Sequence, residues 1–410
     1  MKKETKSAII EKLKASPLFN LSLASKELFH SNFLYWLWSN EETQQIFINI
    51  IETWTGFEYG SNWWENAEVK REFLNLDLCI IYKNKANAED DNNGKILVVL
   101  ENKVKSIPYL AQLDEYVLKV NKHNKTELEK DKVSYILLSL TGSFPNKGRM
   151  KSWTIKYYND FYEKLLYNMG TLSDNNLYEK LLIEDYSKFV ENLHNLQKEW
   201  SIVSDASDQK YFYDDKAEEE IRVHDLCRKS RCAQILLELG RTLGNAEFGV
   251  SIKNIQEKVK KNKPCESVYL NFGMTRGVGL IDVKILFNNN FLLGIQVQGD
   301  SYRHVLEYLS PESVKEGDSG IICESSFFRK NFEDNSTWKI KSDNSILAED
   351  IYPVKPKTKS KKDKDPNFNS YGSTFLYQSR KINKKTIVAK LIELIKSDID
   401  YILHLKSKVI

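Results

Sequence analysis

The pattern of apolar and polar positions along the chain first has the period of helices and then that of strands. Residues 23–38 (LASKELFHSNFLYWLW) and 41–54 carry apolar side chains at helical spacing, so both predict helices that face a core. Residues 67–73 (AEVKREF) and 76–82 (LDLCIIY) instead alternate or run apolar. This change of period predicts that a sheet begins near residue 67.

The passage after these strands predicts a hairpin, a helix and two further strands. The polar loop that follows them ends in Asn93-Gly94, a pair favoured where a tight turn needs positive φ, and leads into the strand ILVVLENK at 96–103. Apolar residues then recur every three or four positions, which predicts an amphipathic helix over about 107–122. Residues 133–140 (VSYILLSL) and 153–157 predict the next strands.

Helices are expected at 159–170 and 176–200, before a polar stretch around Ser204. The order helix, three strands, helix, strand predicts a small mixed sheet with a crossover helix. After Ser204 the pattern restarts, with a helix at 216–243 and a last helix at 384–405. Between them, strands are expected at 267–272, 279–287 and 291–298. The second half is therefore predicted to be an α+β domain.

Length and composition limit the classes of protein to consider. A chain of 410 residues favours two domains, which we expect at 1–203 and 204–410. Its 60 Lys and Arg residues nearly balance its 57 Asp and Glu residues, so any nucleic-acid-binding surface must be local. The five cysteines, an odd number without regular spacing, are typical of a reducing cytoplasm. With neither a secretory signal nor an apolar run of about 20 residues, we expect a cytoplasmic protein without a membrane span.

Charged residues interrupt the predicted strands at positions that suggest chemistry. Glu101 and Lys103 lie two positions apart at a strand end and therefore share a face, whereas Asn102 points oppositely. Asp77 interrupts LDLCIIY, and the predicted hairpin can bring it beside Glu101. Two neighbouring carboxylates repel unless a cation lies between them, and their oxygens, with the backbone carbonyl of Asn102, suit Mg²⁺ or Mn²⁺. Because Lys103 can orient a water or neutralise a phosphate, the set suits phosphodiester hydrolysis.

These residues resemble the PD-(D/E)XK nuclease superfamily. The resemblance rests on Asp77, on Glu101-x-Lys103 and on Gln112-x-x-x-Tyr116 in the following helix. A helix of the type ELFHSNFLYWL and a strand of the type REFxxxD are similar to those of a subgroup of poorly characterised bacterial members. The resemblance covers about residues 20–165 and implies a restriction-endonuclease-like core. The predicted fold class is thus α/β, with a mixed-sheet αβββαβ core and a carboxy-terminal α+β domain.

Carried over to this sequence, the resemblance makes Asp77 and Glu101 metal ligands and Lys103 the catalytic lysine. Gln112 and Tyr116 lie one helical turn apart and so share a face. They match positions that orient the site or contact the substrate backbone. The alternative for a lone Glu-x-Lys at a strand end is a solvated surface ion pair. The additional presence of Asp77, Gln112 and Tyr116 favours the nuclease interpretation.

Other residues near the motif leave alternatives open. Glu72 and Glu27 could each supply a further carboxylate to the metal, but a surface position on the strand or on the helix is the alternative for each. His30 with Ser31 suggests a nucleophile, yet the sequence contains no third partner, and a hydrogen-bonded packing histidine is favoured. Leu76 stands where the superfamily's name has a proline.

The second half carries weaker signals. Asp282 followed by Gln296-x-Gln298 has the layout of the first motif, but amides cannot replace a carboxylate ligand and a lysine, so an ordinary half-buried hairpin is expected. The alternative is that polar residues of this region face a ligand or nucleic acid, namely Gln296, Gln298, Tyr302, Arg303 and His304. The Lys-rich segments 354–366 and 379–385 could contact phosphates, with solvated surface as the alternative.

Taken together, the sequence predicts a metal-dependent nuclease that hydrolyses phosphodiester bonds. DNA is the expected substrate, Mg²⁺ or Mn²⁺ the expected cofactor, and the resemblance implies a role in defence against foreign DNA. The alternative is a nuclease-like fold that binds nucleic acid or protein without cleaving it. The second domain is expected to serve recognition, dimerisation or regulation, so a homodimer is one expectation for the assembly.

Overall fold

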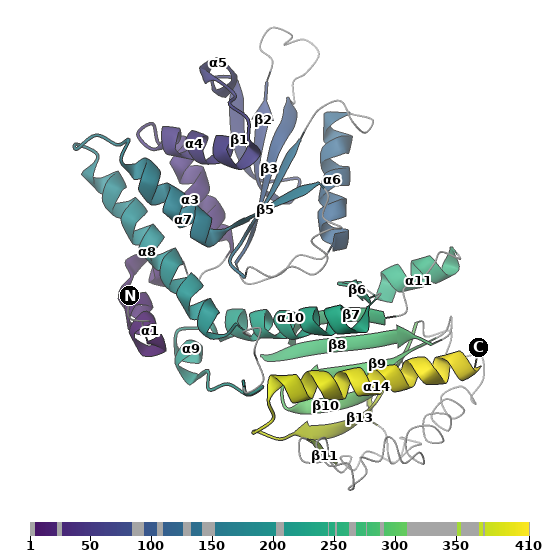
Figure 1. Cartoon of the computed structure of the whole chain (residues 1–410). Helices are drawn as coiled ribbons and strands as arrows, with labels where there is room; N and C mark the ends of the chain where they lie inside the picture. Colours follow the sequence, from purple (N-terminus) through teal and green to yellow (C-terminus); the bar gives the residue numbers. More distant parts are fainter. Residues whose placement is uncertain are drawn as a thin grey trace. The chain divides into compact units, whose positions relative to one another are not determined.

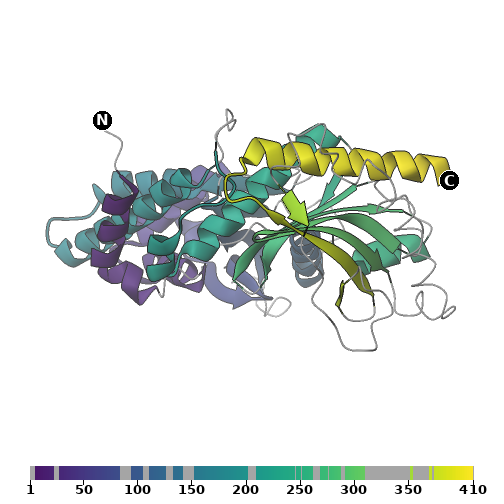
Figure 2. The same cartoon turned by 90° about the horizontal axis from the view of Figure 1, so that it is seen from below.

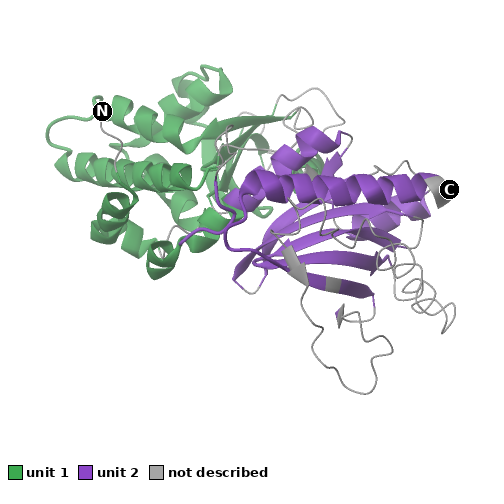
Figure 3. Ribbon diagram, turned by 60° about the horizontal axis from the view of Figure 1, so that its bottom comes forward, with its two compact units in different colours: residues 1–201, 215–230 green, residues 202–214, 231–410 purple. Residues whose placement is uncertain are grey.

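The chain folds into two compact units, coloured separately in Figure 3. The first contains residues 1–201 and 215–230, and the second contains residues 202–214 and 231–410. The computed structural model describes residues 5–22, 27–83, 94–104, 110–125, 133–141, 152–201, 209–244, 246–250, 252–261, 268–275, 277–287, 291–309, 351–353, 369–371 and 374–409. Ser204 lies outside these residues, so the boundary expected there stays a prediction.

The first unit contains a five-stranded sheet in the order β1-β2-β3-β4-β5 (Figure 1). Its strands are β1 (Ala67–Phe73), β2 (Leu76–Tyr82), β3 (Lys95–Lys103), β4 (Ser134–Ser139) and β5 (Trp153–Tyr157). The first three strands pair antiparallel, whereas β3 with β4 and β4 with β5 are parallel. Parallel neighbours need a crossover connection, and helix α6 (Leu110–Asn124) lies between β3 and β4 in the chain. This is the mixed sheet with a crossover helix that the sequence predicts.

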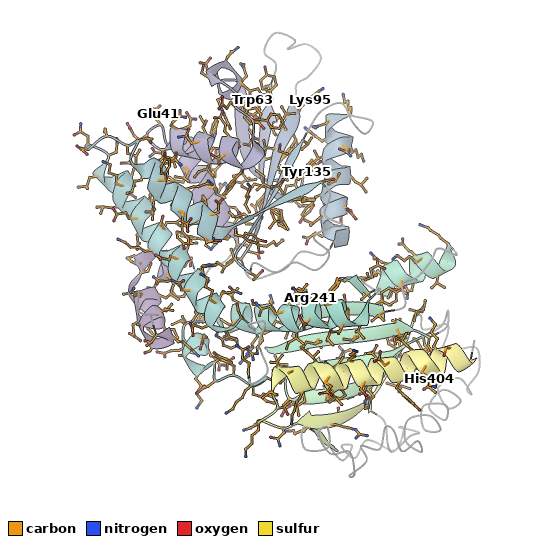
Figure 4. All side chains as sticks on the ribbon, in the orientation of Figure 1. Glu41, Trp63, Lys95, Tyr135, Arg241 and His404 are labelled. Carbon is orange, nitrogen blue, oxygen red and sulfur yellow. The ribbon has the colours of Figure 1, made fainter. Side chains whose placement is uncertain are left out.

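The two faces of this sheet bury different cores. Leu78 and Ile80 of β2 pack in a large cluster with the other helices of the unit, whereas Cys79 and Ile81 pack in a smaller cluster with α6. Tyr135 of β4, labelled in Figure 4, belongs to the smaller cluster. The alternation is the two-residue period of a strand covered on both faces. The other helices are α1 (Lys6–Ala15), α2 (Pro17–Leu21), α3 (Glu27–Ser39), α4 (Gln44–Thr55), α5 (Ser61–Trp64), α7 (Tyr158–Met169), α8 (Leu177–Glu199) and α9 (Lys216–Glu220).

A tight turn leads directly into the strand that carries Asp77. Leu74 and Asn75 have φ of 56° and 63°, and Phe73 pairs with Leu76, so β1 and β2 are joined by a two-residue turn with positive φ at both positions. Leucine rarely adopts this conformation, which is therefore imposed by the flanking strands. The turn fixes the residue from which β2 starts, one position before Asp77.

The second unit is built on an eight-stranded sheet whose main path is β11-β13-β10-β9-β8-β7-β6, with β12 paired to β13. Its strands are β6 (Ala246–Phe248), β7 (Val268–Thr275), β8 (Val278–Leu286), β9 (Phe291–Gln298), β10 (Ser301–Tyr308), β11 (Ile351–Pro353), β12 (Asn369–Tyr371) and β13 (Phe375–Ile382). Its helices are α10 (His224–Leu243), α11 (Ile252–Lys260) and α14 (Val388–Val409), and the division between the units falls within α10. Helix α14 packs against β8 and β9, and Figure 2 shows it (yellow) across one face of the sheet. The predicted α+β organisation of the second half is confirmed.

One predicted helix is wrong. Instead of a single helix over 216–243, the chain forms α9 and α10 with a break between them at residues 221–223. Arg222 has a φ of 60°, which a helix cannot contain. The buried Glu218 receives Lys6 Nζ at 2.7 Å and Trp200 Nε1 at 2.8 Å, so tertiary partners hold the first short helix in place. Residues 354–366 lie outside the described part of the chain, so nothing tests the expectation for that segment.

None of the described helices is both long enough and apolar enough to cross a bilayer.

Candidate active site

The register of β2 and β3 brings the predicted acidic residues together. The two strands pair antiparallel with Leu78 opposite Leu100, so the next position on each strand places Asp77 beside Glu101. The backbone N–H of Asp77 donates to Glu101 Oε2 at 3.4 Å. Asp77 lies where β2 begins and Glu101 lies near the end of β3, so both are at the same end of two neighbouring strands. The hairpin inferred from the sequence therefore places these two carboxylates in one cluster.

Lys103 completes the cluster from the same face of β3. Its Nζ lies 2.8 Å from Glu101 Oε1, and both side chains are almost fully buried. On the other side, the backbone N–H of Asn102 donates to Asp77 Oδ2 at 2.7 Å. Because the N–H and C=O of one strand residue point to the same neighbour, the Asn102 carbonyl also faces the side on which Asp77 lies. The four residues thus place oxygen atoms and one ammonium group around a single small volume.

Burial and mutual repulsion set the charges of this cluster. Burial raises the pKa of Asp77 to about 7, and the carboxylate of Glu101 adds to the rise. Burial also raises the pKa of Glu101, although Lys103 opposes this shift. For Lys103, burial disfavours the ammonium form, but Glu101 and Glu27 outweigh burial, so the net effect is a raised pKa. A second cation between the carboxylates would therefore be favourable.

Helix α6 carries the two remaining residues of the predicted motif. Gln112 Nε2 donates to the hydroxyl oxygen of Tyr116 at 2.7 Å, so both side chains lie on one face of the helix. Tyr116 is buried, and its pKa is raised first by burial and then by the charge of Glu101. The structure therefore brings Tyr116 within electrostatic reach of the acidic cluster, with Gln112 fixed to it.

The two additional carboxylates differ in position. Glu27 lies in the first turn of α3, and its charge acts on Asp77, Glu101 and Lys103. Glu72 is exposed, has a φ of 52°, and is skipped in the pairing of β1 with β2, where Arg71 and Phe73 have partners. The residues on either side of it keep one continuous register, so it lies opposite Asp77 on the neighbouring strand, but it is not among the charges that shift the pKa of Asp77. The charge of Glu27 therefore acts on the cluster, whereas the side chain of Glu72 is exposed.

The side chain of Asn102 makes contacts that the sequence analysis did not include. It is fully buried on the opposite face of β3, where Nδ2 donates to Ser31 Oγ at 2.7 Å and Oδ1 accepts from Tyr158 at 3.3 Å. His30, the neighbour of Ser31, is buried, and its Nδ1 lies 2.8 Å from the Tyr186 hydroxyl, as expected of a packing histidine. The sequence does contain a signal for this contact, because Ser31 and Asn102 are polar residues at positions where the helix and strand periods require apolar ones.

The donor set of the cluster fits a hard divalent cation. Among the described residues, no three His, Cys, Asp or Glu side chains are grouped as a metal site would require. Mg²⁺, however, needs only one or two carboxylates, because water and phosphate oxygens complete its shell. Asp77 and Glu101 with the Asn102 carbonyl would supply three oxygens, and each carboxylate has more lone pairs than the hydrogen bonds it accepts here.

The polar residues considered in the second unit fall on two faces of its sheet. Tyr302 and His304 both hydrogen-bond to Asp398 of α14, at 2.5 Å and 2.9 Å, and are buried under that helix. On the other face, Gln296 donates to Asp282 at 3.2 Å and accepts from Arg303 at 2.9 Å. These contacts satisfy the polar groups within the sheet, in agreement with the half-buried hairpin that we favour.

Comparison with known proteins bears on the first unit. Residues 18–214 match the family model described as the PD-(D/E)XK nuclease superfamily, just under half of the chain. No curated protein and no solved structure matches the chain. The matched segment contains the five-stranded mixed sheet, the crossover helix α6, and the cluster of Asp77, Glu101 and Lys103. By this match and this fold, the amino-terminal part of the chain, residues 18–214, belongs to the PD-(D/E)XK nuclease superfamily.

Proposed function

We propose that the chain is a Mg²⁺- or Mn²⁺-dependent nuclease that hydrolyses phosphodiester bonds in DNA. Asp77, Glu101 and the backbone carbonyl of Asn102 would hold the cation. When bound, a divalent cation neutralises phosphate charge and lowers the pKa of a water molecule. Lys103 would donate hydrogen bonds to the phosphate and stabilise the negative charge that grows on it during hydrolysis. Gln112 and Tyr116 would orient this edge of the site and contact the substrate backbone.

The observation that carries the proposal is the pairing of the half-buried Asp77 and the buried Glu101 with the buried Lys103 at adjoining strand ends. Burial of these charges is unfavourable, and the raised pKa values of Asp77 and Glu101 express that strain. Clusters of this kind are concentrated at functional sites, because a structural role would be served as well by apolar residues. The superfamily match of the same segment supports a nuclease over other uses of a cation.

The proposal is tested with plasmid, linear and single-stranded DNA in Mg²⁺ or Mn²⁺. The unaltered chain is compared with Lys103→Ala and Asp77→Ala, and with Glu72→Ala as the matched control on exposed strand β1. We expect cleavage by the unaltered chain and by the control, and none by the two site variants. Absence of cleavage on every substrate, or equal cleavage by all four proteins, would sink the proposal. A parallel series with RNA decides the substrate class.

A role in defence against foreign DNA is the finer part of the proposal. It is supported by the superfamily match alone, and it requires the nuclease activity proposed above. Bacteria that express the unaltered chain should then resist bacteriophage infection better than bacteria that express Lys103→Ala. Equal plaque numbers for the two strains over a panel of phages would exclude defence while leaving the biochemical activity intact.

A further inference from the structure

The inference concerns the buried side of strand β3, opposite the acidic cluster, and it rests on the proposed metal site. On that side β3 carries Val98 and Leu100, and Val104 follows the strand directly; all three are buried in the large apolar cluster. Asn102 stands among them with no exposed surface. Burying an amide in apolar surroundings is unfavourable unless its hydrogen bonds are made. A leucine would fill the position at lower energetic cost, so the amide requires an explanation.

Partners from two helices satisfy this amide. Ser31 of α3 accepts from Asn102 Nδ2 at 2.7 Å, and Tyr158, the first residue of α7, donates to Oδ1 at 3.3 Å. Ser31 and Tyr158 are themselves buried, with exposed fractions of 0% and 1%. The side chain of Asn102 is thus held at both ends by elements that pack on the back of the sheet.

The same residue holds the acidic cluster through its backbone. The N–H of Asn102 donates to Asp77 Oδ2 at 2.7 Å, and its neighbours in the chain are Glu101 and Lys103. A rotation of the backbone at residue 102 would therefore move all three charged side chains. Ser31 extends the connection, because its hydroxyl lies 3.4 Å from the carbonyl oxygen of Glu27, whose charge acts on the cluster.

We infer that Ser31, Asn102 and Tyr158 form a positioning network for the metal site. Through hydrogen bonds to the Asn102 side chain, Ser31 and Tyr158 fix the backbone that holds Asp77 and that lies between Glu101 and Lys103. All three side chains are buried, so their role in the network is to position other groups and not to bind substrate. Outer partners that orient the groups around a metal typically change its affinity by about 10- to 100-fold when they are removed.

The test measures Mn²⁺ binding to the full chain by calorimetry, beside thermal unfolding without metal. The variant Ser31→Ala/Asn102→Leu removes the central hydrogen bond and leaves apolar groups in a similar volume, but it also takes the acceptor from the Tyr158 hydroxyl, a cost that the thermal unfolding measures. The control is Thr43→Val, which removes a buried hydroxyl that donates to Leu37 O at 3.0 Å in the same unit. Ser31→Thr keeps the hydroxyl and serves as the conservative variant.

We expect the double variant to bind Mn²⁺ about 10- to 100-fold more weakly, and Ser31→Thr to bind it within threefold of the unaltered chain. Thr43→Val should lower the unfolding temperature without changing the affinity. Suppose that the unaltered chain binds Mn²⁺ and that the double variant binds it equally well, or that the double variant and Thr43→Val lose affinity to the same extent. Either result overturns the network and leaves the metal site standing. If the unaltered chain does not bind Mn²⁺, the proposed metal site fails and the inference fails with it.

Discussion

Each unit of the molecule contains an acidic residue two positions before a lysine on a buried strand, together with a second acid from a neighbouring part of the sheet. In the first unit these are Glu101, Lys103 and Asp77, and the lysine Nζ lies 2.8 Å from Glu101 Oε1. In the second unit Lys284 lies between Asp282 and Glu307, at 2.6 Å and 2.7 Å.

The clusters differ in how their negative charge is compensated. Lys284 bridges both of its acids, and Gln296 donates a further hydrogen bond to Asp282, so the second cluster is closed by its own members. In the first cluster the third neighbour is Glu27, which adds negative charge, and the pKa of Asp77 rises to about 7. An acidic residue two positions before a lysine therefore does not by itself define a metal site. A site for a cation also needs carboxylate charge that the protein leaves uncompensated.

The largest expected difference between the clusters is catalytic. Lys103→Met should lower the single-turnover rate of DNA cleavage by about 10²- to 10⁴-fold, because the charge on the phosphate loses its stabilising ammonium group. The rate is measured with saturating Mg²⁺, so that a change in metal affinity does not enter. A loss smaller than tenfold would mean that Lys103 is, like Lys284, a structural partner of its carboxylates.

The reverse is expected for Lys284→Met. Two acids, Asp282 and Glu307, would remain in a largely buried place without their cation, which should lower the free energy of unfolding by about 3–5 kcal/mol. Hydrogen exchange of β8 and β9 amides in urea measures the effect in the second unit. Replacing all three residues by apolar ones should restore most of the lost stability. If Lys284→Met proves as stable as the unaltered chain, the closed ion cluster is not what holds these strands.

The pH dependence of stability should separate an acid of the first cluster, Asp77, from an acid of the second, Asp282. The folded pKa of Asp77, about 7, lies above its ordinary 3.8, so the folded chain holds the proton more tightly than the unfolded chain. Asp77 therefore destabilises the metal-free fold increasingly as the pH rises from about 4 to about 7, with the full effect above pH 7 and none below about pH 4. Asp77→Asn should raise the unfolding free energy by roughly 2 kcal/mol at pH 8, a gain that disappears toward pH 4.

The variant to compare with it is Asp282→Asn in the second cluster. It removes the anion that Lys284 contacts at 2.6 Å, so it should destabilise the chain at pH 8. Chemical denaturation at several pH values, with a chelator present, measures both variants. If Asp77→Asn and Asp282→Asn change the free energy of unfolding equally and independently of pH, the first cluster does not carry uncompensated charge.

The two clusters also show which parts of the fold and of the site the sequence predicts. Local patterns predict the strands and the crossover helix, and the hairpin then brings Asp77 to Glu101, since strand registers follow from period and turns. The partners of a charge are not local. Lys284 and Glu307 lie 23 positions apart, and their contact depends on the pairing of β8, β9 and β10. For the same reason the sequence alone does not separate Glu72 from Glu27, because only the exposed position of Glu72 and the packing of α3 distinguish the two in the fold.

The smallest expected effect concerns Glu27 and Glu72. It tests whether a nearby uncompensated charge contributes to binding of the cation. Glu27→Gln gives the first cluster an amide neighbour, as Gln296 does in the second. It should weaken Mn²⁺ binding about fivefold, roughly 1 kcal/mol, which is the size expected for a partly solvated charge near the ion. Glu72→Gln removes an exposed charge on β1 and should leave the affinity within twofold.

Free Mn²⁺ measured by electron paramagnetic resonance gives both affinities under identical conditions. If the two variants behave alike, long-range charge alone attracts the ion, and α3 has no special place at the site. If Glu27→Gln abolishes binding, Glu27 is itself a ligand, and the cation is held by three carboxylates. An intermediate, roughly fivefold loss confined to Glu27→Gln is the result that the geometry predicts, because Glu27 acts on both carboxylates through its charge.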